Sequence, residues 1–195
     1  MSILVAYASR YGSTRGIAER IAAKLGEAGQ TAELRRAQAV GDLAGYDAFV
    51  IGSGVYNAHW LKEAAELVRR NRGLLAERPV WLFSSGPLGT AAEDTRGRDL
   101  RLAAEPKELA EFKEAINPRG HRVFLGALVS SKLEFAHRMI RKLPAARAAL
   151  PDGDFRDWKD IEVWAEGIAH ELAPEPTAAA ALEEVRHDPA TDADT

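Results

Sequence analysis

Hydroxyl-bearing side chains surround a glycine near the start of the chain, between an apolar run (3–8) and a stretch with apolar residues at helical spacing (17–25). The residues are Ser9, Arg10, Tyr11, Gly12, Ser13 and Thr14. A loop of this kind offers hydroxyls, backbone amides and the positive end of a helix dipole to a phosphate group. The same residues would also suit a simple turn at Gly12 with a helix cap at Ser13 or Thr14. Considered alone, the loop leaves both interpretations open.

Two later stretches could hold the rest of a flat ligand. One follows the apolar run 47–52 and contains Ser53, Gly54, Val55, Tyr56 and Asn57, and the other follows the run 79–83 and contains Ser84, Ser85, Gly86, Pro87, Leu88 and Gly89. Glycines at positions 52 and 54 would allow close approach of the backbone, and Tyr56 offers an aromatic ring for stacking. The stretch from Ser84 to Gly89 offers hydroxyls and backbone amides to the polar edge of a heterocycle. An unliganded tyrosine and an ordinary turn remain the alternatives.

The elements around these stretches alternate between strands and helices. Short apolar runs predict buried strands, and a weaker alternating run (31–36) predicts a strand near a sheet edge. Helical spacing predicts helices between them, the first of which has Gly29 where its C-cap would lie. The predicted strands cover 3–8, 31–36, 47–52, 79–83 and 121–128, and the predicted helices cover 14–25, 60–70, 106–116 and 158–172. This order is typical of an α/β fold whose parallel sheet carries helices on both faces, with ligands bound beyond the carboxyl ends of the strands.

Three segments do not belong to that alternation. Residues 90–105 predict a long loop, and residues 130–150 predict an extra basic amphipathic segment that could meet a membrane surface or pack as an ordinary helix. Residues 173–195 are acidic and poor in large apolar side chains, which predicts a disordered tail.

Composition narrows the chemistry that the chain could perform. The 195 residues include 46% apolar residues and no cysteine, so we expect one main domain whose redox chemistry would require a bound cofactor. The five histidines lack the spacing of a metal site, and we assign no metal and no catalytic residue. A net charge of −3 argues against nucleic-acid binding. The absence of cysteine and of a signal-peptide pattern favours a cytoplasmic protein.

The three stretches, in this order, resemble the flavodoxin family over residues 1–172. Ser9, Tyr11, Gly12 and Thr14 match that family's phosphate pattern of hydroxyl, any, hydroxyl, Gly, any, Thr. Tyr11 departs from the smaller threonine common there, and the flanking arginines 10 and 15 are a second departure. One combination of motifs is similar to the branch related to menaquinone-dependent protoporphyrinogen IX dehydrogenase. The motifs are Tyr-Gly-Ser-Thr, Gly-Ser-Gly-Val-Tyr, Ser-Ser-Gly-Pro-Leu-Gly, His-Arg-Val-Phe-x-Gly-x-Leu and Gly-Asp-Phe-Arg-Asp-Trp.

The resemblance implies a flavodoxin-like, doubly wound, five-stranded parallel sheet of order 2-1-3-4-5, with helices on both faces. It implies that residues 1–172 form an FMN-binding domain, that the three stretches hold the FMN, and that the protein transfers electrons between protein or quinone partners. One alternative is a menaquinone-dependent protoporphyrinogen IX dehydrogenase, for which segment 130–150 would meet a membrane or an anionic tetrapyrrole. The other alternative is a non-redox regulatory domain that has lost the flavin.

Overall fold

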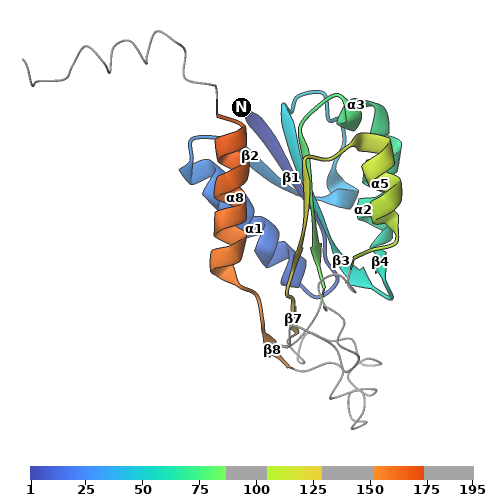
Figure 1. The fold of residues 1–195 in the computed structure, drawn as a ribbon, viewed down its shortest axis with the longest axis vertical. Helices are drawn as coiled ribbons and strands as arrows, with labels where there is room; N and C mark the ends of the chain where they lie inside the picture. Colours follow the sequence, from blue (N-terminus) through green and yellow to red (C-terminus); the bar gives the residue numbers. More distant parts are fainter. Residues whose placement is uncertain (87–104, 129–151, 174–195) are drawn as a thin grey trace, which may run out of the picture.

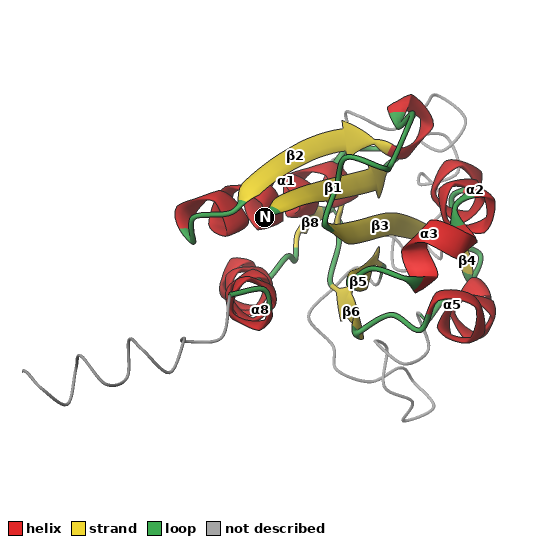
Figure 2. Cartoon of the chain, turned by 90° about the horizontal axis from the view of Figure 1, so that it is seen from above, coloured by secondary structure: helices red, strands yellow, loops and turns green. Residues whose placement is uncertain are grey.

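The chain forms a parallel β-sheet with helices packed on both of its faces (Figures 1 and 2). A computed structural model describes residues 1–86, 105–128 and 152–173. The parallel strands are β1 (Ser2–Ala8), β2 (Thr31–Arg36), β3 (Ala48–Tyr56), β5 (Val80–Ser85) and β6 (Gly120–Phe124). They lie in the order β2-β1-β3-β5-β6, while the short strand β4 (His59–Trp60) pairs antiparallel with the end of β3. Taken in chain order without β4, this is the predicted order 2-1-3-4-5.

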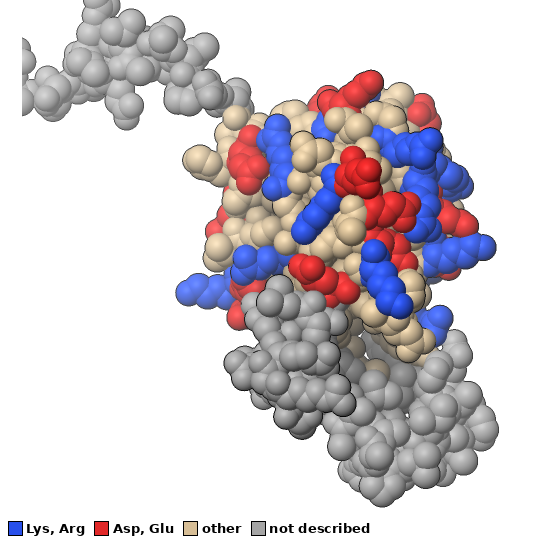
Figure 3. Space-filling model, turned by 45° about the vertical axis from the view of Figure 1, so that its right-hand side comes forward, with Lys and Arg blue, Asp and Glu red and all other residues tan. Residues whose placement is uncertain are grey.

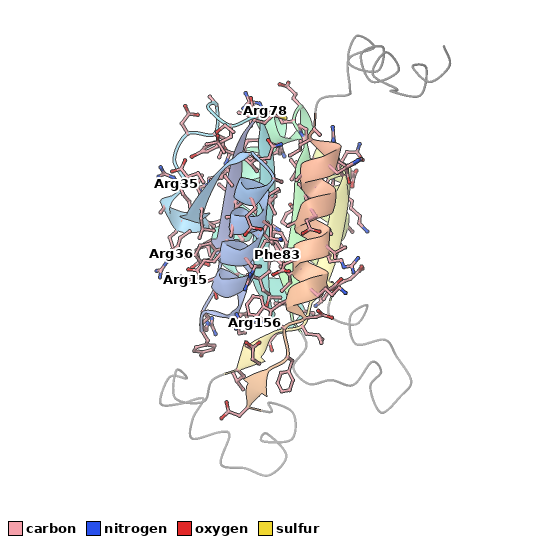
Figure 4. The ribbon with its side chains drawn as sticks, turned by 90° about the vertical axis from the view of Figure 1, so that its left-hand side faces the viewer. Arg15, Arg35, Arg36, Arg78, Phe83 and Arg156 are labelled. Carbon is pink, nitrogen blue, oxygen red and sulfur yellow. The ribbon has the colours of Figure 1, made fainter. Side chains whose placement is uncertain are left out.

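The helices divide between the two faces of the sheet. Helices α1 (Ser13–Glu27) and α8 (Trp158–Glu171) lie side by side on one face, as Figure 4 shows. The other face carries α2 (Lys62–Arg70), α3 (Arg72–Ala76) and α5 (Glu108–Ile116), with a 3-10 turn, η1, at Ala37–Ala39. Gly29 follows α1 with a φ of 81°, which is the left-handed conformation expected just beyond a helix end.

Two apolar cores hold these layers together because successive strand residues point to opposite faces. Leu4, Phe49 and Leu82 pack in the core beneath α2 and α5, whereas Val50 and Trp81 pack in the core beneath α1 and α8. Strands β1, β3 and β5 are buried on both faces, and β2 is half exposed at the sheet edge, as its weaker alternation predicts.

Several predicted boundaries were wrong at the carboxyl edge of the sheet, which is the lower edge in Figure 1. Strand β3 continues to Tyr56 and β5 to Ser85, because the polar pairs Ser53–Ser84 and Gly54–Ser85 extend the ladder beyond the apolar runs. The predicted strand 121–128 is divided into β6 and β7 (Ala127–Leu128), and β7 pairs antiparallel with β8 (Gly153–Asp154).

The three additional segments cannot be compared with their predictions in full. Residues 87–104, 129–151 and 174–195 lie outside the described residues, and they contain nearly all of the predicted loop, the basic segment and the acidic tail. Within the ranges that are described, no helix has the length and apolar character needed to cross a membrane.

Candidate functional site

The loop between β1 and α1 is shaped by Gly12. This residue has a φ of 92°, a left-handed conformation that favours glycine, and its amide donates to Ser9 Oγ at 3.1 Å. The N-cap residue of α1 is Gly12, which has no side chain, so neither Ser13 nor Thr14 occupies the cap position that the alternative interpretation required. The first turn of α1 therefore presents its backbone amides at this end of the helix, where an anion would be stabilised.

The hydroxyl of Ser13 connects the loop to two strands. Its Oγ atom lies 3.2 Å from Ser85 Oγ and accepts a hydrogen bond from the Ala127 amide at 2.8 Å. Thr14 is buried beside Gly54, where a β-carbon on the glycine would lie 3.2 Å from Thr14 Oγ1. The structure thus brings parts of all three predicted stretches together.

Tyr56 lies over this junction, in contact with two residues of the first loop. The Arg10 guanidinium stands 4.9 Å from the centroid of the Tyr56 ring, and the Tyr11 ring meets it edge-on at 6.5 Å. Burial raises the pKa of Tyr56, while the positive charge of Arg10 acts in the opposite direction. The tyrosine therefore remains a neutral, partly buried aromatic surface at neutral pH.

Two of the predicted site serines belong to the opposite face of the sheet. Ser53 Oγ donates to the Gly54 carbonyl and accepts from the Leu61 amide, both at 2.9 Å. Ser84 Oγ accepts from Trp60 Nε1 at 2.8 Å and lies 2.9 Å from His121 Nε2. Both hydroxyls are buried and already bonded. They hold the sheet to its neighbouring elements and do not face Tyr56, Gly54 or Ser85, because side chains alternate along a strand.

Of the remaining predicted site residues, some have contacts that support the fold and others lie outside the described residues. Val55 packs against the core beneath α2, and the Gly86 amide donates to the Phe124 carbonyl at 3.1 Å. Asn57 and Ala58 form the β3–β4 turn with φ values of 52° and 61°. Pro87, Leu88 and Gly89 lie outside the described residues.

Gly52 has a packing role. A β-carbon at this position would overlap the ring of Phe83 (labelled in Figure 4), so the glycine makes room for a core side chain and does not form a ligand loop.

The β3–β4 hairpin that carries Tyr56 is fastened to α5. Glu108 bonds to His59 Nδ1 at 2.7 Å and accepts from the Trp60 amide at 3.2 Å, and the Lys107 amide donates to the Ala58 carbonyl at 2.9 Å. Burial acts to raise the pKa of Glu108, but these hydrogen bonds outweigh burial and lower the pKa. The charged carboxylate therefore keeps the hairpin in place at neutral pH.

Arg156, between β8 and α8, is a site neighbour to which the sequence reasoning gave no role (Figure 4). Its guanidinium pairs with Asp154 at 2.6 Å, lies 4.3 Å from the ring centroid of Trp158 and reaches the Ser13 carbonyl at 3.4 Å. It also fills the space beside Gly16. The Gly-Asp-Phe-Arg-Asp-Trp motif was visible in the sequence, but its contact with a loop more than a hundred residues away was not.

A pocket of about 610 Å³ lies between this segment and α1. Its walls are formed by Tyr11, Gly12, Ser13, Arg15, Gly16, Glu19, Arg20, Ala23, Ala127, Arg156 and Trp158. The pocket reaches the first loop from the α8 side and does not include Tyr56, so it flanks the junction of the three stretches. Within the described residues, no group of three acidic or histidine side chains could hold a metal ion.

Comparisons with known proteins give a family and a fold. The family model described as a flavodoxin domain matches residues 4–149. Flavodoxin 2 from Bacillus cereus has a TM-score of 0.57 at 18% identity, and the match covers 88% of this chain and 100% of that one. A mutant flavodoxin from Pseudomonas aeruginosa, in which one cysteine is replaced by serine, gives 0.56 at 15%, covering 88% and 99%.

A larger protein also contains this fold. The rubredoxin:oxygen oxidoreductase from Desulfovibrio gigas gives a TM-score of 0.55 at 18% identity, but the match covers 88% of this chain and only 36% of that one. No curated protein matches the sequence.

Proposed function

Because the chain belongs to the flavodoxin family, we propose that it binds FMN and transfers electrons between redox partners. The observation that carries the proposal is the N-terminus of α1, whose N-cap residue is the left-handed Gly12. Its neighbours Ser13 and Thr14 are fixed against the ends of β5 and β3. A rigid, glycine-turned helix N-terminus of this kind suits a phosphate group.

The residues present fit the phosphate end of FMN. Backbone amides of residues 11–14 would hold the phosphate, and Ser9 keeps a hydroxyl proton to donate while its oxygen accepts from Gly12. Ser13 already has two partners, so its role would be to hold the loop in shape. In this proposal the helix dipole and the amides bind the phosphate, and hydroxyls support them.

The ring of FMN would lie against the hairpin side of the site. Tyr56, which the Tyr11 ring meets edge-on, would offer the stacking surface. Gly54 lets Tyr56 and Thr14 pack close together, because a β-carbon there would lie 3.0 Å from the Tyr56 ring and 3.2 Å from Thr14 Oγ1. The bound cofactor would supply the redox chemistry, since the chain contains no cysteine. The protein contributes binding, orientation and exclusion of water from one ring face.

The partners follow from the same proposal. A family that carries electrons through a bound flavin requires a donor and an acceptor, which we propose to be a protein or a quinone. We also propose that the chain itself acts in the cytoplasm. Segment 130–150, the candidate for peripheral membrane contact, lies outside the described residues.

A second candidate is oxidation of a porphyrinogen with menaquinone as acceptor. It is supported by the motif combination, and Arg156 of the Gly-Asp-Phe-Arg-Asp-Trp motif reaches the proposed phosphate loop at Ser13. Protoporphyrinogen oxidation by the FMN-loaded protein, assayed with and without menaquinone, separates the candidates. Menaquinone-dependent turnover supports the dehydrogenase, and its absence supports the electron carrier.

The visible spectrum of the purified protein tests FMN binding. We expect flavin absorbance that remains with the protein on gel filtration, either as purified or after incubation with FMN. If no flavin is retained after reconstitution, the proposal fails and the non-redox alternative is favoured.

A further inference from the structure

Arg10 places a positive charge beside the aromatic surface proposed for the flavin. Its guanidinium lies 4.9 Å from the centroid of the Tyr56 ring, in the range of a cation–π contact. The neighbouring Tyr11 ring meets Tyr56 edge-on. Arg10 is therefore held near the ring by a specific contact, although its side chain is exposed.

Arg10 and Arg15, five residues along the chain, carry the same charge but differ in whether an acidic side chain pairs with them. Arg15 pairs with Glu19 at 2.7 Å, and this ion pair offsets much of its field. No acidic side chain in the described part of the chain forms an ion pair with Arg10. A group that stacks on Tyr56 would consequently lie within a few ångströms of a cation that has no ion-pair partner within the described residues.

We propose that Arg10 is a residue that sets the reduction potential of the bound flavin. The inference rests on the proposed function, because it concerns FMN stacked at Tyr56. Reduction adds negative charge to a flavin, and a nearby cation stabilises the more negative form. Arg10 would therefore raise the midpoint potential and favour the reduced state, opposite to the effect of an acidic site.

The test is an anaerobic potentiometric titration of the FMN-loaded protein and its variants. Arg10→Gln removes the charge, Arg10→Lys keeps it, and Arg15→Gln removes a compensated charge as the matched control. We expect Arg10→Gln to lower the equilibrium constant for reduction about threefold to tenfold, which is roughly 15 to 30 mV for a two-electron couple. Arg10→Lys should retain most of the wild-type potential, and Arg15→Gln should leave it unchanged.

A second measurement uses the salt dependence of the wild-type potential, with Arg10→Gln as its control. Because Arg10 is exposed, added salt screens its charge and should lower the midpoint potential of the wild-type protein towards that of Arg10→Gln. The salt effect should be smaller in Arg10→Gln than in wild type.

The outcomes separate this inference from the proposed function. FMN bound at full occupancy with the same potential in wild type and Arg10→Gln would overturn the role of Arg10 and leave FMN binding intact. A wild-type protein that retains no FMN would overturn both.

Discussion

Tyr56 is the side chain that we propose to stack on the flavin ring. Tyr56→Ala removes the ring beside Tyr11 and should weaken FMN binding by roughly 1–2 kcal/mol, or about tenfold in the dissociation constant. Tyr56→Phe keeps the ring and should bind nearly as well as wild type. Fluorescence titration with FMN measures both constants, and equal affinity in Tyr56→Ala and wild type would remove Tyr56 from the site.

Alanine substitutions at Gly52 and Gly167 compare a crowded glycine position with an open one. A methyl group on Gly52 would overlap the Phe83 ring within the core, so Gly52→Ala should lower the free energy of unfolding by about 1–3 kcal/mol. Gly167, within α8, has open space around the same position, and Gly167→Ala should raise it by about 0.5–1 kcal/mol. Urea unfolding measures both. If Gly52→Ala leaves the free energy of unfolding unchanged, the core can accommodate the extra methyl group beside Phe83 and the packing role of Gly52 is contradicted.

His121 makes the stability of the fold sensitive to acid. Burial, with a smaller contribution from the charge of Lys113, lowers the pKa of His121 from 6.5 to about 4. The folded state therefore resists a proton that the unfolded chain accepts, and stability present above pH 6.5 is lost as the pH falls towards 4.

The corresponding variant is His121→Gln. Wild type should lose about 1–2 kcal/mol of unfolding free energy between about pH 7 and pH 5 through this residue, and the variant should lose less. Urea unfolding at the two pH values measures the difference. An identical loss in both proteins would mean that His121 is protonated in the folded state.

The alternation of strand side chains explains which site residues could be found from the sequence. The three stretches were identified by composition, and parts of all three do meet at Ser13, Thr14 and Tyr56. Ser53 and Ser84 were included because they were treated as loop residues. Once β3 and β5 are extended, the alternation places both on the opposite face. The sequence did not indicate this extension, because the residues directly after both apolar runs are polar or glycine and do not continue them.

At the scale of elements, the proposed phosphate loop contacts a segment that is distant in the sequence. Arg156 joins β8, the first turn of α1 and the Trp158 ring, and none of these contacts involves the proposed ligand directly. We infer that it positions the loop. Arg156→Gln should loosen the loop and weaken FMN binding about threefold to tenfold, whereas riboflavin, which lacks the phosphate, should bind as before.

Arg119→Gln is the control for this prediction. Arg119 also stacks on a tryptophan, Trp81, but beside the start of β6, at the amino edge of the sheet. It should change neither affinity. Equal weakening of FMN and riboflavin by Arg156→Gln would point to a general loss of structure and would contradict a specific effect on the phosphate loop.

The order of strands and helices followed from hydrophobic periodicity, since each buried run is apolar on both faces. The β3–β4 and β7–β8 pairs did not follow from it. Each contains two-residue strands stabilised by contacts such as Glu108 with the Trp60 amide or Phe155 with the Gly126 carbonyl, which depend on the assembled fold. Residues of such short pairs carry no periodic signal of their own.

Over the whole molecule, the proposed site lies at the carboxyl edge of the sheet, beside the N-terminus of α1. The face shown in Figure 3 mixes acidic and basic side chains, and ion pairs such as Arg69–Glu111 join its helices α2 and α5. The proposed ligand edge has instead Arg10, which forms no ion pair within the described residues, and the N-terminus of α1, whose N-cap residue is Gly12. This difference is what we expect if the carboxyl edge is the place where the proposed anionic ligand binds.

The comparison of FMN and riboflavin dissociation constants for the wild-type protein is the most direct test of the central claim. If the glycine-turned loop holds the phosphate, FMN should bind at least about tenfold more tightly than riboflavin, a difference of about 1.4 kcal/mol or more. Equal affinities, or no binding of either flavin, would contradict a phosphate site at Ser9 to Thr14.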